Sequence, residues 1–293
     1  MKSGCFFNLC ACCGFCVFLA VVAVLSFFAW TAEGVNRAEG VNRLPVVVLH
    51  GIASSAAKMD RLSAWIADEF QVQTFNIEIG NGERTSLYTS MPRQLDELCD
   101  VIYNNPALTK GFNFIGMSQG GLLARGYVEQ CNKYPVRNLI TLVAPHGGVY
   151  LDTEVDMYTD FIQMHLSIAG YWRNPRQLEK YLERCNYLPH LNNEVKFDPA
   201  QRDGLKVLNN LVLVWSPQDD VLQPAESGKF STFDRDLRVV PLDKTKIYED
   251  DLLGIKYLDE QNRFHIYQTN CTHVEHRDPI CFSQLYQIFR FYL

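Results

Sequence analysis

The chain has 293 residues, of which 47% are hydrophobic and 12% aromatic, enough to bury one substantial core without a second domain. The formal net charge of -6 argues against a nucleic-acid partner, because no basic stripe is present to displace phosphate counterions. The sequence contains no Walker loop, zinc-finger spacing or H-E-x-x-H motif, so we expect a protein without a metal or another cofactor.

The N-terminal segment, residues 1–32, has the composition of a targeting signal. No charged residue lies between Cys5 and Trp30, a stretch long enough to cross a bilayer as a helix. A lysine and the terminal amine precede it, which predicts that the remainder of the chain enters the lumen. The segment is therefore either a cleaved signal peptide or a signal anchor that holds the protein on a membrane through residues 5–30. Residues 33–43, which repeat E-G-V-N-R, are predicted to be a linker.

The ten cysteines fall into two groups. Half of them crowd the targeting segment, and the others are spread over the globular part: Cys99, Cys131, Cys185, Cys271 and Cys281. Both targeting alternatives deliver the globular part to an oxidising compartment, where disulfide bonds persist. We therefore expect the protein in the lumen of the secretory pathway.

From residue 44 onward, apolar runs alternate with amphipathic segments. The expected strands are 45–49, 72–77, 112–115, 138–143, 211–215 and 264–268. The expected helices are 59–70, 91–103, the segment that follows Ser118, and 278–292. Continuous apolar runs such as P-V-V-V-L are typical of strands buried on both faces of a parallel sheet. The alternation indicates an α/β fold with a doubly wound, mostly parallel sheet that binds ligands at the carboxyl ends of its strands.

Residues from about 150 to 205 interrupt this alternation. The segment is rich in aromatic and aliphatic residues and then turns polar, a pattern that favours a mostly helical cap inserted between two strands. Its apolar side either lines a groove for a hydrocarbon chain or only packs the cap on the core. We expect residues 44–293 to form one catalytic domain that contains this cap insertion.

The motif G-M-S-Q-G at 116–120 lies between the expected strand at 112–115 and a segment whose apolar residues include Leu122 and Leu123. This is the G-x-S-x-G nucleophile elbow of the α/β-hydrolase fold, in its strand-turn-helix context. Glycine is needed on both sides because a side chain there would collide with the neighbouring strand or helix. The motif predicts that Ser118 is a nucleophile and that the fold class is α/β hydrolase.

A serine hydroxyl needs a general base that is oriented by a third group. In this fold the acid and then the histidine follow the serine along the chain, from loops after later strands. Asp219 and Asp220 follow the strand at 211–215, and the loop before the last helix contains His273 and His276. The spacing does not separate the two aspartates or the two histidines, so both choices stay open at this point.

Further motifs are L-H-G-I at 49–52, I-E-I-G at 77–80, S-Q-G-G at 118–121, L-I at 139–140 leading to His146 and Gly148, and Y-E-D-D-L-L-G-I-K-Y-L at 248–258. With them the chain, from about Pro45 to its C-terminus, resembles the palmitoyl-protein thioesterases, lysosomal hydrolases that remove fatty acyl groups from cysteine. The resemblance implies that Asp219 is the acid of the triad and His273 its base, with Asp220 and His276 as the alternatives.

The resemblance also implies an oxyanion hole made by the backbone N–H groups of Ile52 and Gln119. The position of Gln119 at the start of a helix agrees, because free N–H groups and the helix dipole face developing negative charge there. Both residues act through the main chain in this scheme. We therefore expect their side chains to tolerate substitution.

The family has a disulfide at positions that match Cys99 and Cys131, so the resemblance implies that bond here. Cys271 and Cys281 bracket His273 and could pair, which would fix the loop of the base and leave Cys185 unpaired. The N-glycosylation sequon of this chain, Asn270-Cys271-Thr272, immediately precedes His273. A glycan on Asn270 requires that its side chain points outward.

The function implied by the resemblance is hydrolysis of long-chain fatty acyl thioesters through an acyl-enzyme, in the lysosome or the secretory lumen. Its partners would be S-acylated proteins or peptides and fatty acyl thioesters. Two other functions remain open. One is a lipase or carboxylesterase acting on oxygen esters of lipids, because the triad does not decide the substrate. The other is a membrane-anchored protein of the same fold that binds without turnover.

Overall fold

The structure, a computed structural model, describes residues 43–293. The targeting segment predicted for 1–32 lies outside the described residues, and so does the predicted linker at 33–43 except for its last residue. Among the residues that are described, no helix has the length and apolar character that crossing a bilayer requires.

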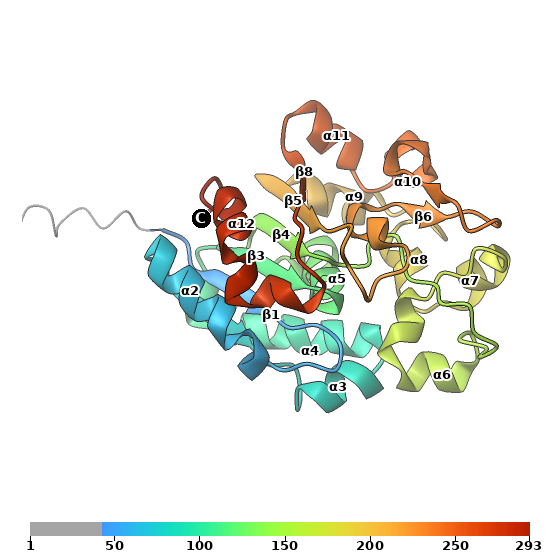
Figure 1. Ribbon diagram of the computed structural model, residues 1–293, viewed down its shortest axis with the longest axis horizontal. Coiled ribbons are helices and arrows are strands. Elements are labelled where there is room, and N and C mark those ends of the chain that lie inside the picture. Colours follow the sequence, from blue (N-terminus) through green and yellow to red (C-terminus); the bar gives the residue numbers. More distant parts are fainter. Residues whose placement is uncertain (1–42) are drawn as a thin grey trace, which may run out of the picture. The chain divides into compact units, whose positions relative to one another are not determined.

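The central feature of the described chain is a six-stranded parallel sheet with the order β2-β1-β3-β4-β5-β8 (Figure 1). Its strands are β1 (Val46–Leu49), β2 (Thr74–Ile77), β3 (Phe112–Met117), β4 (Val136–Leu142), β5 (Asn210–Trp215) and β8 (Phe264–Gln268). Every residue of β1 and β3 is buried, because the sheet is covered on both faces. The doubly wound parallel sheet expected from the alternating sequence pattern is confirmed.

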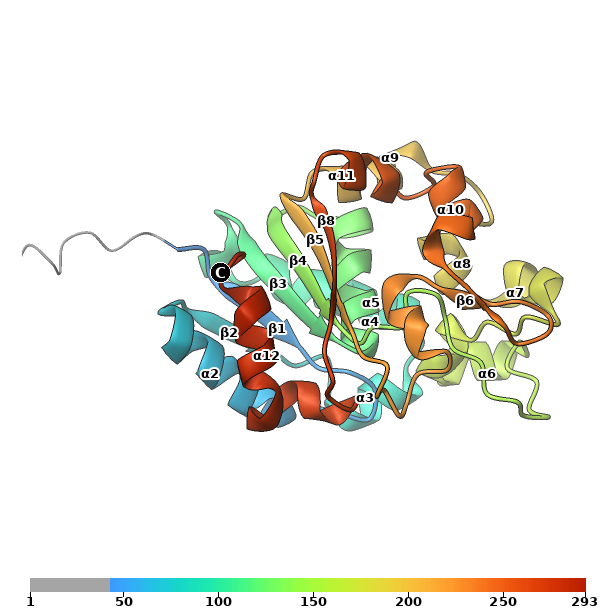
Figure 2. The ribbon, with the colours of Figure 1, turned by 45° about the horizontal axis from the view of Figure 1, so that its top comes forward.

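Helices cover the two faces of the sheet. On one face α2 (Asp60–Phe70) lies beside the C-terminal helix α12 (Pro279–Phe289), and the stacked rings of Trp65 and Phe282, 4.4 Å apart, join them (Figures 1 and 2). On the other face lie α4 (Met91–Tyr103) and α5 (Gln119–Gly126). This arrangement leaves the carboxyl edge of the sheet open to the loops that follow its strands.

The segment predicted as a cap contains only short helices, which lie beside the sheet in Figure 1. They are α6 (Asp160–His165), α7 (Leu178–Arg184), α8 (Leu188–Leu191) and α9 (Pro199–Lys206). The mostly helical character expected for 150–205 is confirmed, although the segment before α6 carries no regular helix.

Several short elements were not expected from the sequence. They are α3 (Glu83–Tyr88), the hairpin β6 (Thr232–Phe233) and β7 (Val239–Val240), and the helices α10 (Lys246–Glu249) and α11 (Ile255–Glu260). Each is too short to give a clear hydrophobic period. Other bounds shift slightly: α2 starts one residue late after a 3-10 turn, and α12 ends at Phe289.

A buried polar cluster joins the elbow helix α5 to the cap. Arg125 of α5 lies 3.4 Å from the Glu129 carboxylate, and neither side chain is exposed. The Arg125 guanidinium also donates to Oδ1 of Asn192, directly after α8, at 2.6 Å, and lies 5.0 Å from the centre of the Phe230 ring. The cluster therefore ties α5, which follows Ser118 directly, to the segment predicted as a cap.

Replacing Arg125 with methionine is expected to lower the free energy of unfolding by about 3–5 kcal/mol, because Glu129, whose pKa burial already raises to about 8, is then a buried carboxyl group that must take up a proton and lacks its partner. Urea unfolding measures this loss. The double variant Arg125→Met/Glu129→Met should recover most of it, since apolar groups of similar volume can replace a buried pair. The exposed pair of Arg184 and Asp160 provides the control: Arg184→Met should cost less than about 1 kcal/mol. Equal losses for the two single arginine variants would contradict the argument.

Candidate active site

Ser118 stands on the sharp turn between β3 and α5. Its backbone has φ of 54° and ψ of -128°, a conformation that costs a non-glycine residue about 1–3 kcal/mol and is held by its surroundings. A Cβ atom on Gly116 would lie 2.5 Å from the carbonyl oxygen of Gly120, and one on Gly120 would collide with the carbonyl oxygen of His50. The glycines of the motif are therefore needed for the turn that presents Ser118 above the sheet.

The carboxylate of Asp219 holds one nitrogen of the His273 ring. Oδ2 of Asp219 lies 2.8 Å from Nδ1 of His273, and the Asp219 side chain is fully buried. Its other oxygen accepts hydrogen bonds from the backbone N–H groups of Val221 and Leu222 at 2.9 and 2.8 Å. A carboxylate on Nδ1 selects the tautomer with a proton there, so Nε2 of His273 is the atom that can accept a proton.

His276 and Asp220, the alternatives from the sequence, have different surroundings. Nε2 of His276 lies 2.7 Å from Oγ1 of Thr269, and its Nδ1 lies 2.9 Å from the carbonyl oxygen of Thr272. Burial lowers the pKa of His276 below its ordinary value. Asp220 is exposed and accepts a hydrogen bond at 3.2 Å from the backbone N–H of His273. Both residues therefore brace the loop, whereas Asp219 contacts the ring of His273.

The loops that carry these residues leave the same edge of the sheet. The register pairs Met117 at the end of β3 with Leu142, Leu142 with Val214, and Val214 with Tyr267. Ser118, the turn with Asp219 and the loop with His273 follow directly after β3, β5 and β8, respectively. The three side chains thus belong to one rim, although they are far apart along the chain.

A further contact brings the histidine loop back toward the elbow. Nη1 of Arg277, at the end of the turn that starts after His273, donates to Oγ of Ser54 at 3.2 Å. Ser54 belongs to the loop after β1, which begins at Gly51. That glycine packs on Ser118, since a Cβ atom added to it would lie 2.9 Å from Cβ of Ser118. The histidine loop and the elbow therefore both adjoin the loop after β1.

The backbone groups expected to form an oxyanion hole lie on both sides of Ser118. Gln119 is the first residue of α5, where N–H groups have no partner within the helix. Ile52 follows Gly51 in the loop after β1. Their positions are compatible with two N–H donors that converge near the serine hydroxyl.

The side chain of Gln119 does not match the expectation that it tolerates substitution, because it is buried and hydrogen-bonded at both its nitrogen and its oxygen. Its Nε2 donates to the carbonyl oxygen of Ser86 at 2.9 Å and to Oε1 of Gln94 at 3.1 Å. Its Oε1 accepts a hydrogen bond from the Tyr171 hydroxyl of the cap at 3.1 Å. The expectation is wrong for Gln119, since the side chain links the elbow to α3, α4 and the cap.

Replacing Tyr171 with phenylalanine is expected to lower kcat/KM by about tenfold, because the buried Oε1 of Gln119 loses its donor and the adjacent N–H loses its alignment. Steady-state kinetics with an acyl thioester measures the effect. Tyr158→Phe is the matched control: the Tyr158 hydroxyl is also buried in the cap, but it bonds to the backbone of Trp172 and Asn174. An equal loss of kcat/KM in the two variants would show that the cap as a whole is responsible.

The structure contains the Cys99–Cys131 disulfide, which joins α4 to the turn after α5. It also contains a Cys271–Cys281 disulfide that spans the loop of His273 with a sequence separation of 10. Cys185 carries a buried thiol that donates to the carbonyl oxygens of Ala169 and Gly170. Asn270 is exposed, as a glycan on the sequon would require.

Within residues 43–293, no group of three or more His, Cys, Asp or Glu side chains is arranged to hold a metal ion.

The family model described as palmitoyl protein thioesterase matches residues 45–273. A solved structure of a lipase-esterase related protein from Clostridium acetobutylicum is 13% identical, with a TM-score of 0.48 over 85% of this chain and 95% of that one.

Two curated relatives are similar over most of their length. Palmitoyl-protein thioesterase 3 of Dictyostelium discoideum is 38% identical over 79% of this chain and 86% of its own. The lysosomal thioesterase PPT2 homolog of Drosophila melanogaster is 33% identical over 75% of this chain and 81% of its own. The parallel sheet and the strand-turn-helix elbow are consistent with these similarities. The chain is a hydrolase that belongs to the palmitoyl protein thioesterase family.

Proposed function

We propose that residues 44–293 form a catalytic domain that hydrolyses long-chain fatty acyl thioesters of cysteine, with Ser118 as nucleophile, His273 as base and Asp219 as the acid that orients it. The observation that carries the proposal is the 2.8 Å contact between the buried Asp219 carboxylate and Nδ1 of His273, on the rim that also carries Ser118. Membership of the family supports the choice of a thioester over an oxygen ester.

The reaction proceeds in two steps. Nε2 of His273 takes the proton of the Ser118 hydroxyl while Oγ attacks the thioester carbonyl carbon, and the resulting oxyanion accepts hydrogen bonds from the N–H groups of Ile52 and Gln119. The C–S bond breaks and the cysteine sulfur leaves with the proton from His273. Water then attacks the acyl-serine with His273 again as the base, which releases the fatty acid and restores the Ser118 hydroxyl.

Asp219 contributes through the imidazole. It keeps the proton of neutral His273 on Nδ1 and stabilises the imidazolium that forms when Nε2 takes the serine proton. Thiolate is a good leaving group, so this site needs less help in protonating the leaving group than a site that cleaves amides.

The proposed substrates are S-acylated proteins or peptides and free fatty acyl thioesters. Some relatives carry the name lysosomal thioesterase, which supports a lysosomal or other luminal location for this protein. Both disulfides agree with such a compartment. We also propose that Asn270 is a glycosylation site, since its exposed side chain is open to the modifying enzyme.

A substrate panel tests the proposal. The full chain is compared for hydrolysis of a palmitoyl-cysteine peptide, palmitoyl-CoA and a glyceride, and kcat/KM should be highest for one of the two thioesters. A strong preference for the glyceride would instead favour a lipase. A fluorophosphonate probe should label the wild type and not the Ser118→Ala variant, whereas absence of labelling in the wild type would favour a protein that binds without turnover.

A further inference from the structure

The peptide group between Gly51 and Ile52 lies against the nucleophile. A Cβ atom on Gly51 would lie 3.4 Å from Oγ of Ser118, so the α-carbon before this peptide group is in the immediate neighbourhood of the reacting oxygen. The N–H of Ile52 belongs to the same peptide group as the carbonyl of Gly51. A hydrogen bond that fixes the orientation of the Gly51 carbonyl therefore also fixes the direction of the Ile52 N–H.

His50 holds this carbonyl. Its ring is buried, with 2% of the residue exposed, and Nδ1 lies 2.9 Å from the carbonyl oxygen of Gly51. A peptide group is planar and trans, so its C=O and N–H bonds point in opposite directions. A hydrogen bond from Nδ1 to the Gly51 oxygen thus makes the Ile52 N–H point away from the His50 ring, within the peptide plane.

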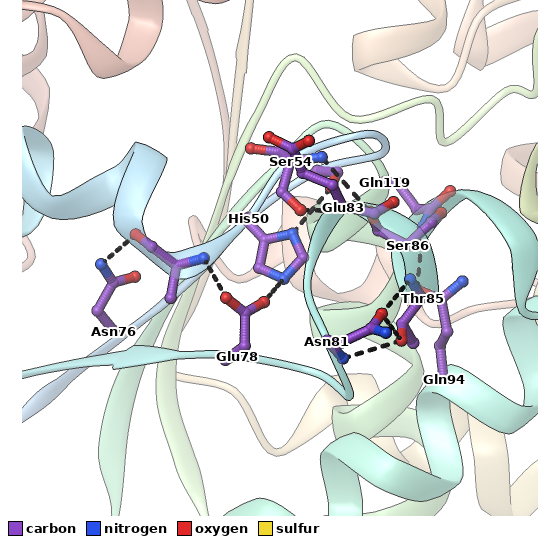
Figure 3. Close-up of polar contacts among 12 residues, drawn as sticks. His50, Ser54, Asn76, Glu78, Asn81, Glu83, Thr85, Ser86, Gln94 and Gln119 are labelled. Atoms are coloured by element: carbon purple, nitrogen blue, oxygen red, sulfur yellow. Dashed lines mark hydrogen bonds and ion pairs between the residues drawn. The ribbon is translucent and has the colours of Figure 1, made fainter.

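Glu78, just after β2, holds the ring from its other side (Figure 3). Oε1 of Glu78 lies 2.9 Å from Nε2 of His50, and its Oε2 accepts a hydrogen bond from the backbone N–H of Ala56 at 3.0 Å. One carboxylate therefore contacts the ring at the start of the loop after β1 and the backbone at its end. Gly82 packs on it closely, since a Cβ atom there would lie 2.9 Å from Oε1.

The contacts of His50 differ from those of His273. Both ring nitrogens of His50 face oxygen acceptors, on Gly51 and on Glu78. This leaves no ring nitrogen of His50 free to accept a proton from Ser118, and its role must lie elsewhere.

We propose that His50, held by Glu78, is a positioning residue that aims the Ile52 N–H at the oxyanion of the transition state. The proposal rests on the proposed function, because it needs an acyl-transfer reaction at Ser118. His50 touches neither substrate nor the reacting atoms in this scheme. It acts through the Gly51–Ile52 peptide group, so its loss should appear in the chemical step and leave substrate binding unchanged.

Two amide substitutions at His50 separate this role from simple packing. The side-chain nitrogen of asparagine occupies nearly the position of Nδ1, and that of glutamine nearly the position of Nε2. His50→Asn therefore keeps a donor for the Gly51 carbonyl, whereas His50→Gln keeps only the contact with Glu78. Loss of one oxyanion donor costs roughly 10²–10³-fold in kcat, and misalignment costs part of this. We expect kcat to fall about 10-fold to 100-fold in His50→Gln and less than about 3-fold in His50→Asn, with KM unchanged in both.

The measurement is single-turnover acylation of the full chain by a palmitoyl thioester, with thermal unfolding of each variant as the check on folding. Equal kcat losses in the asparagine and glutamine variants, or a loss that appears in KM, would overturn the proposal. Glu78→Gln, which keeps a hydrogen-bonding group on both contacts, should retain more activity than Glu78→Ala. Ser118→Ala tests the proposed function separately: activity that survives in it removes the triad, whereas an inactive Ser118→Ala with fully active His50 variants removes only the positioning role.

Discussion

Replacing Ser118 with alanine is expected to lower kcat for hydrolysis of a palmitoyl-cysteine peptide by about 10⁴-fold or more, as removal of the triad nucleophile does in subtilisin. The covalent step is lost with the hydroxyl, while the oxyanion donors and the binding surface remain. KM should therefore change little. Steady-state kinetics with the pure variant, together with the absence of an acyl-enzyme in mass spectrometry, measures the effect.

Ser167 provides the control for this prediction. It is fully buried in the cap, and its hydroxyl has no hydrogen-bond partner within the described chain. Ser167→Ala should therefore keep kcat within about twofold of the wild type, because it removes a single buried atom that takes part in none of the proposed proton transfers. Retention of activity in Ser118→Ala, or a comparable loss in Ser167→Ala, would contradict the assignment of the nucleophile.

Replacing Asp219 with asparagine is expected to lower kcat by about 10⁴-fold, the size of effect seen when the triad acid of a serine protease becomes an amide. The amide keeps the shape of the side chain but can present its NH2 group to Nδ1 of His273. The ring then carries its proton on Nε2 and no longer accepts the proton of Ser118. Stability should fall little, because the amide oxygen can still accept the N–H groups of Val221 and Leu222.

Asp220 is the matched control for this acid. It is the next residue, it is exposed, and it contacts only the backbone N–H of His273. Asp220→Asn keeps an acceptor for that N–H, so kcat should stay within about threefold of the wild type. If kcat falls equally in both variants, the electrostatic field of the turn and not the contact of Asp219 with His273 would be the source of the effect.

The elbow and the parallel sheet could be predicted from the sequence because their signals are local. A glycine on each side of Ser118 and a continuous apolar run before it define a strand-turn-helix segment without reference to the rest of the chain. The buried strands give equally clear signals, since both of their faces are apolar. Each of these features can therefore be recognised from a short stretch of sequence alone.

The network around Gln119 could not be predicted in the same way. Its partners Ser86, Gln94 and Tyr171 come from three separate elements and lie 33, 25 and 52 residues away along the chain. No spacing rule connects a buried amide with such partners. The sequence left the choice between His273 and His276 open for the same reason. The contacts that distinguish the two rings come from residues that only the fold brings close to them.

The Cys271–Cys281 disulfide has a consequence for how the protein must be made. The ribosome delivers two thiols, and the covalent bond that ties the loop of His273 to the start of α12 is added afterwards by oxidative folding enzymes. Protein produced in a reducing bacterial cytoplasm would keep these sulfurs apart and leave the His273 imidazole on a longer, untethered segment. Export to the periplasm, or refolding with a glutathione redox couple, is therefore the appropriate route to active material.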